Sequence, residues 1–176
     1  MVGETTTPIL HVSQLAAALG LPVAPSSEPT RVAWETLPLL RSWLDRIRPL
    51  DLECLTTPTQ SRGRSLRNLT VNVFHPFELL PAAWTTHDFP WDPDGDDERE
   101  QALRTAPKVV AYAEQRLGIW TDFVLGLGDG DPVISSPRGE LPFSALLESQ
   151  REHVLFHHAQ LVEFLACWAP SGPGIS

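Results

Sequence analysis

The feature that most constrains the fold is a long helical pattern near the C-terminus, between Pro142 and Trp168. No proline or glycine interrupts it, and apolar residues recur every three to four positions, which is the period of an amphipathic helix. Ala169-Pro170 then ends the pattern. We therefore expect one long helix, with a single face formed by Leu146, Ser149, His153, Phe156, His157, Leu161 and Phe164.

Three further segments show the same period and predict three more helices. Pro38 is expected to kink or split the first of them, and Pro76 is expected to kink the second. Ser65 and Thr105 are suitable N-caps for the second and third helices. The segments run from about 31 to 48 with Thr30 as cap, from 65 through 75, and from 105 to Gly126.

Four helices without a convincing alternating strand pattern predict an all-α fold, a single-domain four-helix bundle. The chain of 176 residues is long enough for one domain with its own core. The acidic stretch 85–104 and the turn-rich stretch 126–139 are expected to be loops. The predicted organisation is an N-terminal arm and linker (1–29), with a short helix after Ser13, then the bundle (30–169) and a disordered tail (170–176).

The charge balance limits the kinds of partner. Thirteen Lys and Arg against 22 Asp and Glu give a formal charge of -9, and no basic cluster is longer than Arg62-Gly63-Arg64. Nucleic acids and anionic membranes need concentrated positive charge, so neither is an expected partner. Since no membrane span or signal peptide pattern is present either, we expect a cytoplasmic protein.

The two cysteines are expected to have no catalytic role. Cys54 and Cys167 lie far apart in the sequence, and a cytosolic setting disfavours a disulfide between them. Cys167 lies in an apolar helix end and is predicted to be a small buried hydrophobe. No sequence neighbour of Cys54 would lower the pKa of its thiol.

Two histidines one helical turn apart are the strongest chemical signal. His153 and His157 share a helix face, with Cβ atoms about 5–6 Å apart. This spacing suits two ligands of one metal ion, and the alternative is a pair of partly exposed or hydrogen-bonded core histidines. His158 lies about 100° around the helix and cannot share that face.

His75, near the end of the second predicted helix, is a candidate third ligand. Bundles build metal sites from side chains on facing helices. A helix-terminal histidine that interacts with the helix dipole is the alternative. Three neutral imidazoles would suit Zn²⁺, Ni²⁺ or Fe²⁺ and leave coordination positions open.

Several polar residues lie near these histidines in the helical pattern. Asn68, Asn72 and Glu78 share roughly the face of His75, and Gln160 follows His157 by one turn. They could orient the imidazoles or bind a cofactor or substrate. Ordinary polar lining of the bundle is the alternative.

The histidines and their surroundings resemble the DinB / YfiT-like superfamily of four-helix metalloproteins. The resemblance rests on Arg62-Gly63-Arg64-Ser65-Leu66-Arg67-Asn68-Leu69 leading to Val73-Phe74-His75, and on Glu152-His153 followed by His157. It covers about residues 30–168 and depends mainly on spacing. Two departures are Glu152, where relatives often carry tryptophan, and Pro76 directly after the helix-two histidine.

The resemblance implies an up-down-down-up bundle, often a homodimer, with Zn²⁺ or Ni²⁺ bound by His75, His153 and His157. Characterised branches use low-molecular-weight thiols, as mycothiol-dependent maleylpyruvate isomerases and bacterial thiol S-transferases do. We therefore expect a metal-dependent enzyme that uses such a thiol on a small electrophilic metabolite, with Glu78 or Glu152 as proton shuttle. Two alternatives remain open: a Lewis-acid isomerase or cyclase in small-molecule biosynthesis, and a non-catalytic small-molecule-binding bundle.

Overall fold

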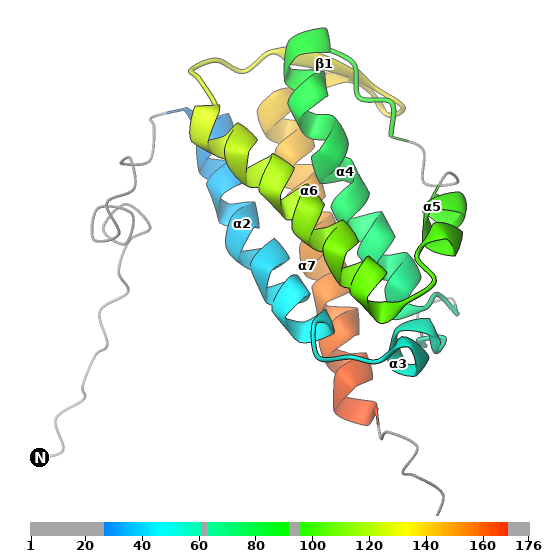
Figure 1. Cartoon of the computed structure of the whole chain (residues 1–176). Coiled ribbons are helices and arrows are strands. Elements are labelled where there is room, and N and C mark those ends of the chain that lie inside the picture. Colours follow the sequence, from blue (N-terminus) through cyan, green and yellow to red (C-terminus); the bar gives the residue numbers. More distant parts are fainter. Residues whose placement is uncertain (1–26, 61–62, 92–95, 169–176) are drawn as a thin grey trace, which may run out of the picture.

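The computed structural model describes residues 27–60, 63–91 and 96–168, and this part of the chain is mostly helical (Figure 1). The expected all-α class is therefore confirmed, apart from one small hairpin. The predicted arm up to residue 26 and the predicted tail 170–176 lie outside the described residues. The elements are α2 (Glu28–Ile47), α3 (Leu52–Thr56), α4 (Leu66–Thr86), α5 (Asp96–Ala102), α6 (Ala106–Gly126), β1 (Val133–Ser136), β2 (Gly139–Pro142) and α7 (Phe143–Cys167).

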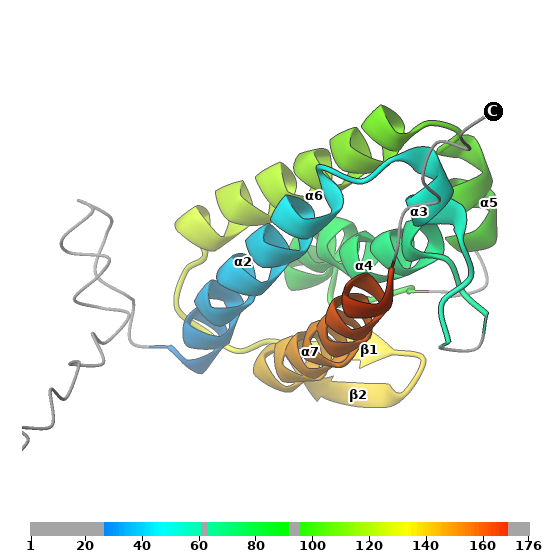
Figure 2. The same cartoon turned by 90° about the horizontal axis from the view of Figure 1, so that it is seen from below.

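The four long helices lie side by side around one core. α2 packs against α6 and α7, and α4 packs against the same two helices. In Figure 1, α2 and α7 run downward, whereas α4 and α6 run upward. Figure 2 shows the hairpin of β1 and β2 beside α7. The short helices α3 and α5 both pack against α4. Within the described ranges, no helix combines the length and apolarity needed to cross a membrane.

Large aromatic side chains fill the core, and two tryptophans also satisfy their polar atoms there. Trp43 and Trp120 are fully buried. Trp43 Nε1 donates to Thr70 Oγ1 at 3.1 Å, and Trp120 Nε1 donates to Thr36 Oγ1 at 2.7 Å. Each bond joins two helices, α2 with α4 and α2 with α6. The helices are thereby held in register by buried hydrogen bonds as well as by apolar contact.

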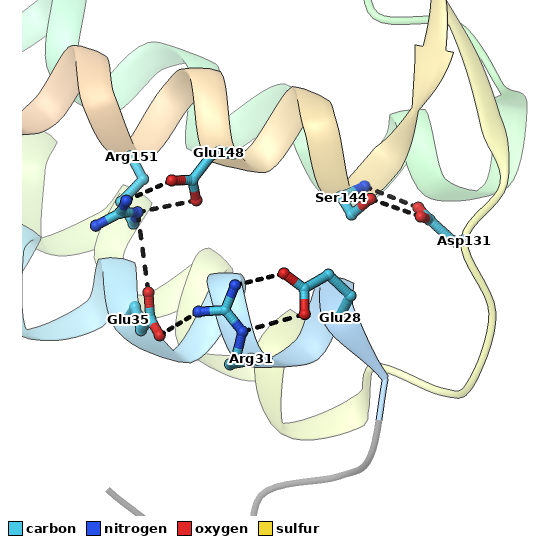
Figure 3. Close-up of polar contacts among 7 residues, drawn as sticks. All are labelled: Glu28, Arg31, Glu35, Asp131, Ser144, Glu148 and Arg151. Carbon is cyan, nitrogen blue, oxygen red and sulfur yellow. Dashed lines mark hydrogen bonds and ion pairs between the residues drawn. The ribbon is translucent and has the colours of Figure 1, made fainter.

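Local sequence explains where most helices begin. Ser65 Oγ accepts from the Asn68 amide at 3.1 Å, and Thr105 Oγ1 accepts from the Lys108 amide at 3.4 Å, so both predicted caps are confirmed. α7 has Pro142 at its N-cap position, which offers no side-chain oxygen. Asp131 acts instead: its carboxylate accepts from Ser144 N at 2.8 Å and from Ser144 Oγ at 2.6 Å (Figure 3).

One of the proline alternatives is excluded. α2 continues through Pro38, so the helix is not split there, and α4 continues through Pro76 and Pro81. The kinks expected at Pro38 and Pro76 stay predictions. α2 also begins earlier than predicted, after Ser27, because Pro29 fits the first helical turn, where its missing N–H is not needed. Thr30, predicted as the cap, is a buried residue of the first turn.

Both predicted loops contain ordered elements. The stretch 85–104 holds α5, and its Phe89 is buried, with a backbone bond from Phe89 N to Ser135 O of 2.8 Å. The stretch 126–139 holds β1 and the start of β2, which pair antiparallel. Only Ile134 is buried among the four residues of β1, so the strand has no alternating pattern to detect.

A chain of ion pairs on the surface links α2 to α7 (Figure 3). Arg31 pairs with Glu28 and Glu35 on α2, and Arg151 of α7 pairs with Glu148. Arg151 Nε also lies 3.9 Å from Glu35 Oε2, which joins the two sets. The charged groups are partly exposed, so the network contributes little to stability and mainly fixes neighbours on the two helices.

Candidate functional site

The two predicted imidazoles do lie together on α7. The ring centroids of His153 and His157 are 4.6 Å apart. The face of α7 that enters the core is, however, rotated from the predicted one, because Phe156 is 63% exposed and Ser149 and His153 are half-buried. The pair therefore lies at the edge of the core, with His157 inside it. The buried residues of α7 are Phe143, Leu146, Leu147, Gln150, Val154, His157 and Leu161.

Each imidazole is held by one carboxamide. His153 Nε2 lies 2.9 Å from Asn72 Oδ1 of α4, and His157 Nδ1 lies 2.7 Å from Gln160 Oε1. An amide oxygen only accepts, so His153 donates from Nε2 and His157 donates from Nδ1. Nε2 of His157 is then an unprotonated nitrogen with a lone pair. The predicted positions of Asn72 and Gln160 beside the histidines agree with these contacts.

Burial keeps His157 in its neutral form. Loss of hydration lowers the pKa of His157, and the nearby Arg64 guanidinium lowers it further, whereas the hydrogen bond with Gln160 acts in the opposite direction. A neutral imidazole is the form that binds a metal ion or accepts a proton. His157 is thus prepared for either role at neutral pH.

A cavity of about 450 Å³ opens beside the pair. The Trp91 ring forms part of its wall, 5.4 Å from the His153 ring between centroids. Gln150 is 4% exposed, and its Oε1 is buried without a hydrogen-bond partner. A volume of this size suits a small organic molecule. The cavity is lined by Arg64, Asn72, Trp91, Arg138, Ser149, Gln150, Glu152, His153, Phe156 and His157.

Two of the predicted polar residues lie away from this cavity. Asn68 Nδ2 donates to Glu100 Oε2 at 2.8 Å, which ties the start of α4 to α5. Glu78 forms an ion pair with Arg116 of α6, with 3.0 Å between Oε2 and Nη2. Of the two predicted proton shuttles, Glu152 lines the cavity and Glu78 faces α6.

His75 lies outside the cavity wall to which His153 and His157 belong. It is 3% exposed. α4 and α7 run in opposite directions (Figure 1), and Asn72 is level with His153. The turn of α4 that carries His75 therefore lies toward the start of α7, away from His157. Among the described residues, no three His, Cys, Asp or Glu side chains are grouped to hold a metal ion. The three-histidine ligand set thus remains a prediction.

The other histidines of the described ranges lie outside the site. His158 Nε2 lies 3.0 Å from Ser42 Oγ, and its ring meets the Trp43 ring edge-on, so it faces α2. His87 is exposed and ends α4 in the left-handed conformation, with φ of 60°. The separation of His158 from the pair agrees with the helical geometry expected from the sequence.

The two cysteines differ in their exposure to solvent. Cys54 is 1% exposed, and burial together with Asp51 and Glu53 raises the pKa of its thiol to about 11. Cys167 is exposed, so its prediction as a buried residue is wrong. The rotated face of α7 explains this, because Leu161 is the last fully buried residue of the helix.

Six cavity residues were absent from the predicted site residues: Arg64, Trp91, Arg138, Ser149, Gln150 and Phe156. Gln150 had a local signal, since it precedes His153 and His157 by three and seven positions on the helix. Trp91 and Arg138 come from a loop and a hairpin turn, whose positions depend on tertiary packing. Arg64 appeared in a short basic run and in the segment that carries the family resemblance, but not as a predicted site residue.

The fold and cavity define a mostly helical protein with a polar, histidine-containing pocket at the edge of its core. No family model matches the chain, and no curated protein or solved structure matches it either.

Proposed function

We propose that the protein is a four-helix metalloprotein of DinB / YfiT-like type that binds one divalent ion, Zn²⁺ or Ni²⁺, at His153 and His157. The observation that carries this proposal is the pair of imidazoles, 4.6 Å apart between centroids, beside a cavity of about 450 Å³. In chain order, α2 runs down, α4 and α6 run up, and α7 runs down in Figure 1, a pattern that agrees with the up-down-down-up topology of that superfamily.

The donor set fits a transition metal. Nε2 of His157 carries a lone pair, because Nδ1 donates to Gln160. A ligand histidine typically donates its second nitrogen to a nearby oxygen in this way, which fixes the ring and its tautomer. The third protein ligand is proposed to come from α4. His75 is the residue that the resemblance implies, and Asn72 is the residue already in contact with His153.

The proposed activity uses a low-molecular-weight thiol on a small electrophilic molecule. A bound ion supplies positive charge that lowers the pKa of a thiol or water in the cavity. Glu152 lines the same cavity and is exposed, so it can accept the thiol proton and pass it to solvent. The thiolate sulfur would then form a bond with the electrophilic carbon as a π bond or a leaving-group bond at that carbon breaks, and the displaced electron pair would take a proton from solvent. Trp91 would shield one side of the cavity from water.

Metal analysis tests the proposal first. Purified protein, dialysed against Zn²⁺ or Ni²⁺ and then against metal-free buffer, is expected to retain about one ion per chain by mass spectrometry of the elements. His153→Ala and His157→Ala should each weaken binding at least about tenfold, since each removes one ligand. His87→Asn is the matched control, because His87 is exposed and asparagine accepts its left-handed backbone.

A comparison of α4 variants identifies the third ligand. His75→Ala should release the ion if His75 coordinates it, whereas Asn72→Ala should do so if the carboxamide coordinates it. Stoichiometric binding that survives both His153→Ala and His157→Ala would contradict the proposal. If the ion binds but no thiol is consumed with any electrophile offered, the thiol-dependent activity is wrong, and the metal site stands.

A further inference from the structure

The cavity beside His153 has a positive group near each of its two ends. Arg138, in the hairpin turn, donates from Nη1 to Ser149 Oγ at 3.2 Å, and Arg64, just before the start of α4, lines the same cavity. Asn72 of α4 contacts His153, and Arg64 precedes Asn72 by eight residues in the chain. Because α4 runs antiparallel to α7 (Figure 1), Arg64 lies toward the later turns of α7, on the other side of His153 from Ser149. The two guanidinium groups therefore mark opposite ends of one cavity.

Neither guanidinium is neutralised within the described part of the chain. No carboxylate there pairs with Arg64 or Arg138, although the protein carries a net charge of -9. Among the described residues that line the cavity, Glu152 is the one acidic residue, and it is exposed. Two unpaired arginines in an acidic protein make the cavity locally positive, which favours an anionic ligand.

The wall between the arginines combines two aromatic side chains with unused polar atoms. Phe156 and Trp91 supply aromatic surface. Trp91 Nε1 is a buried donor without a hydrogen-bond partner, and Gln150 contributes a buried amide whose Oε1 also has none. Buried polar atoms are nearly always paired in a native protein, so unpaired ones in a cavity wall indicate a missing ligand or water.

We propose that the cavity binds a small organic dicarboxylate, with one carboxylate at Arg64, the other at Arg138, and the carbon chain against Trp91 and Phe156. Guanidinium groups bind carboxylates through paired, charge-assisted hydrogen bonds. This inference rests on the proposed function only in taking the cavity as the substrate site, because neither arginine is a proposed metal ligand.

Calorimetric titration of metal-free protein tests the proposal. The probes are the α,ω-dicarboxylates from succinate to suberate, each compared with the monocarboxylate of the same chain length. The best dicarboxylate is expected to bind at least about tenfold more tightly than its monocarboxylate, since it gains a second charge-assisted contact. Affinity should also pass through an optimum chain length, because the arginines stand at fixed ends.

Variants assign the two contacts. Arg64→Gln and Arg138→Gln should each reduce the affinity for the best dicarboxylate to about that of the monocarboxylate, and Arg41→Gln, at an exposed position of α2, should leave it unchanged. Equal binding of mono- and dicarboxylates by the wild-type protein would overturn the proposal. So would dicarboxylate binding that occurs only after metal is added, because the anion would then bind the ion and not the arginines. If the protein binds dicarboxylates but no metal, the inference stands and the metal proposal fails.

Discussion

At the scale of single residues, burial decides what each polar group can do. Trp120 Nε1 is buried and has Thr36 Oγ1 as its acceptor, while His157 is buried and has Gln160 Oε1. The first contact can only hold the core together. The second also sets which imidazole nitrogen remains available at the cavity, so the same type of bond serves structure in one place and chemistry in the other.

Replacing Thr36 by valine should destabilise the protein. Thr36→Val keeps the side-chain shape but leaves Trp120 Nε1 buried without an acceptor, which costs about 1–3 kcal/mol of unfolding free energy. Urea denaturation measures the change. Thr85→Val is the matched control, since Thr85 is exposed and its hydroxyl likewise bonds to the carbonyl three residues earlier. Equal losses in the two variants would show that the Trp120 contact is unimportant.

The two thiols should react at very different rates. The thiolate is the reactive form, and the pKa of about 11 at buried Cys54 leaves roughly one thiol in a thousand ionised at pH 8. Iodoacetamide should therefore modify exposed Cys167 first, and labelling of Cys54 should increase as pH rises toward 11 or when urea unfolds the chain. Peptide mass spectrometry follows both sites. Modification of native Cys54 as fast as Cys167 at pH 8 would contradict this description.

At the scale of elements, α7 is fixed at its start and along one side. Asp131 closes its first turn, and the ion pairs of Arg151 join it to α2 (Figure 3). α4 contacts it through Asn72 and His153. The histidine pair thus lies on a helix whose position is defined by three different parts of the chain.

Loss of Asp131 should weaken α7 more than loss of a neighbouring carboxylate. Asp131→Ala removes the oxygen that accepts from Ser144 N, and the loss of such a cap costs about 0.5–2 kcal/mol. Exposed Asp129 provides the control, and Asp129→Ala is expected to change the unfolding free energy by less than about 0.5 kcal/mol. Thermal and urea unfolding of both variants give the comparison. If Asp131→Ala leaves the unfolding free energy unchanged, the hairpin positions α7 without this contact.

The elements that could be predicted are those whose signals are local. The Ser65 and Thr105 caps are confirmed, because a cap depends only on residues within one turn. α5 and the β1–β2 hairpin were missed, since a seven-residue helix and four-residue strands carry too few buried positions to show a period. A split at Pro38 was one of two predicted outcomes, whereas α2 runs through Pro38 and packs against α6 and α7.

At the scale of the whole molecule, the site forms where α7, α4 and two connecting segments meet. The sequence indicated the residues from helices, His153, His157, Asn72 and Gln160. Three other residues reach the cavity only through tertiary packing, namely Arg64, Trp91 and Arg138. No local sequence pattern predicts that they line it. His75 was expected in the same site from its helix position, which stays a prediction, and Asn72 is an α4 residue that contacts His153.

The most direct test of the central claim is a crystal structure of the protein grown with Ni²⁺ or Zn²⁺, with anomalous diffraction recorded on both sides of the metal absorption edge. We predict one strong anomalous peak between His153 and His157, within about 2.0–2.2 Å of a nitrogen of each imidazole. A third ligand from α4 should be visible in the same map. A peak elsewhere on the surface, or none at this pair in metal-loaded protein, would contradict the account.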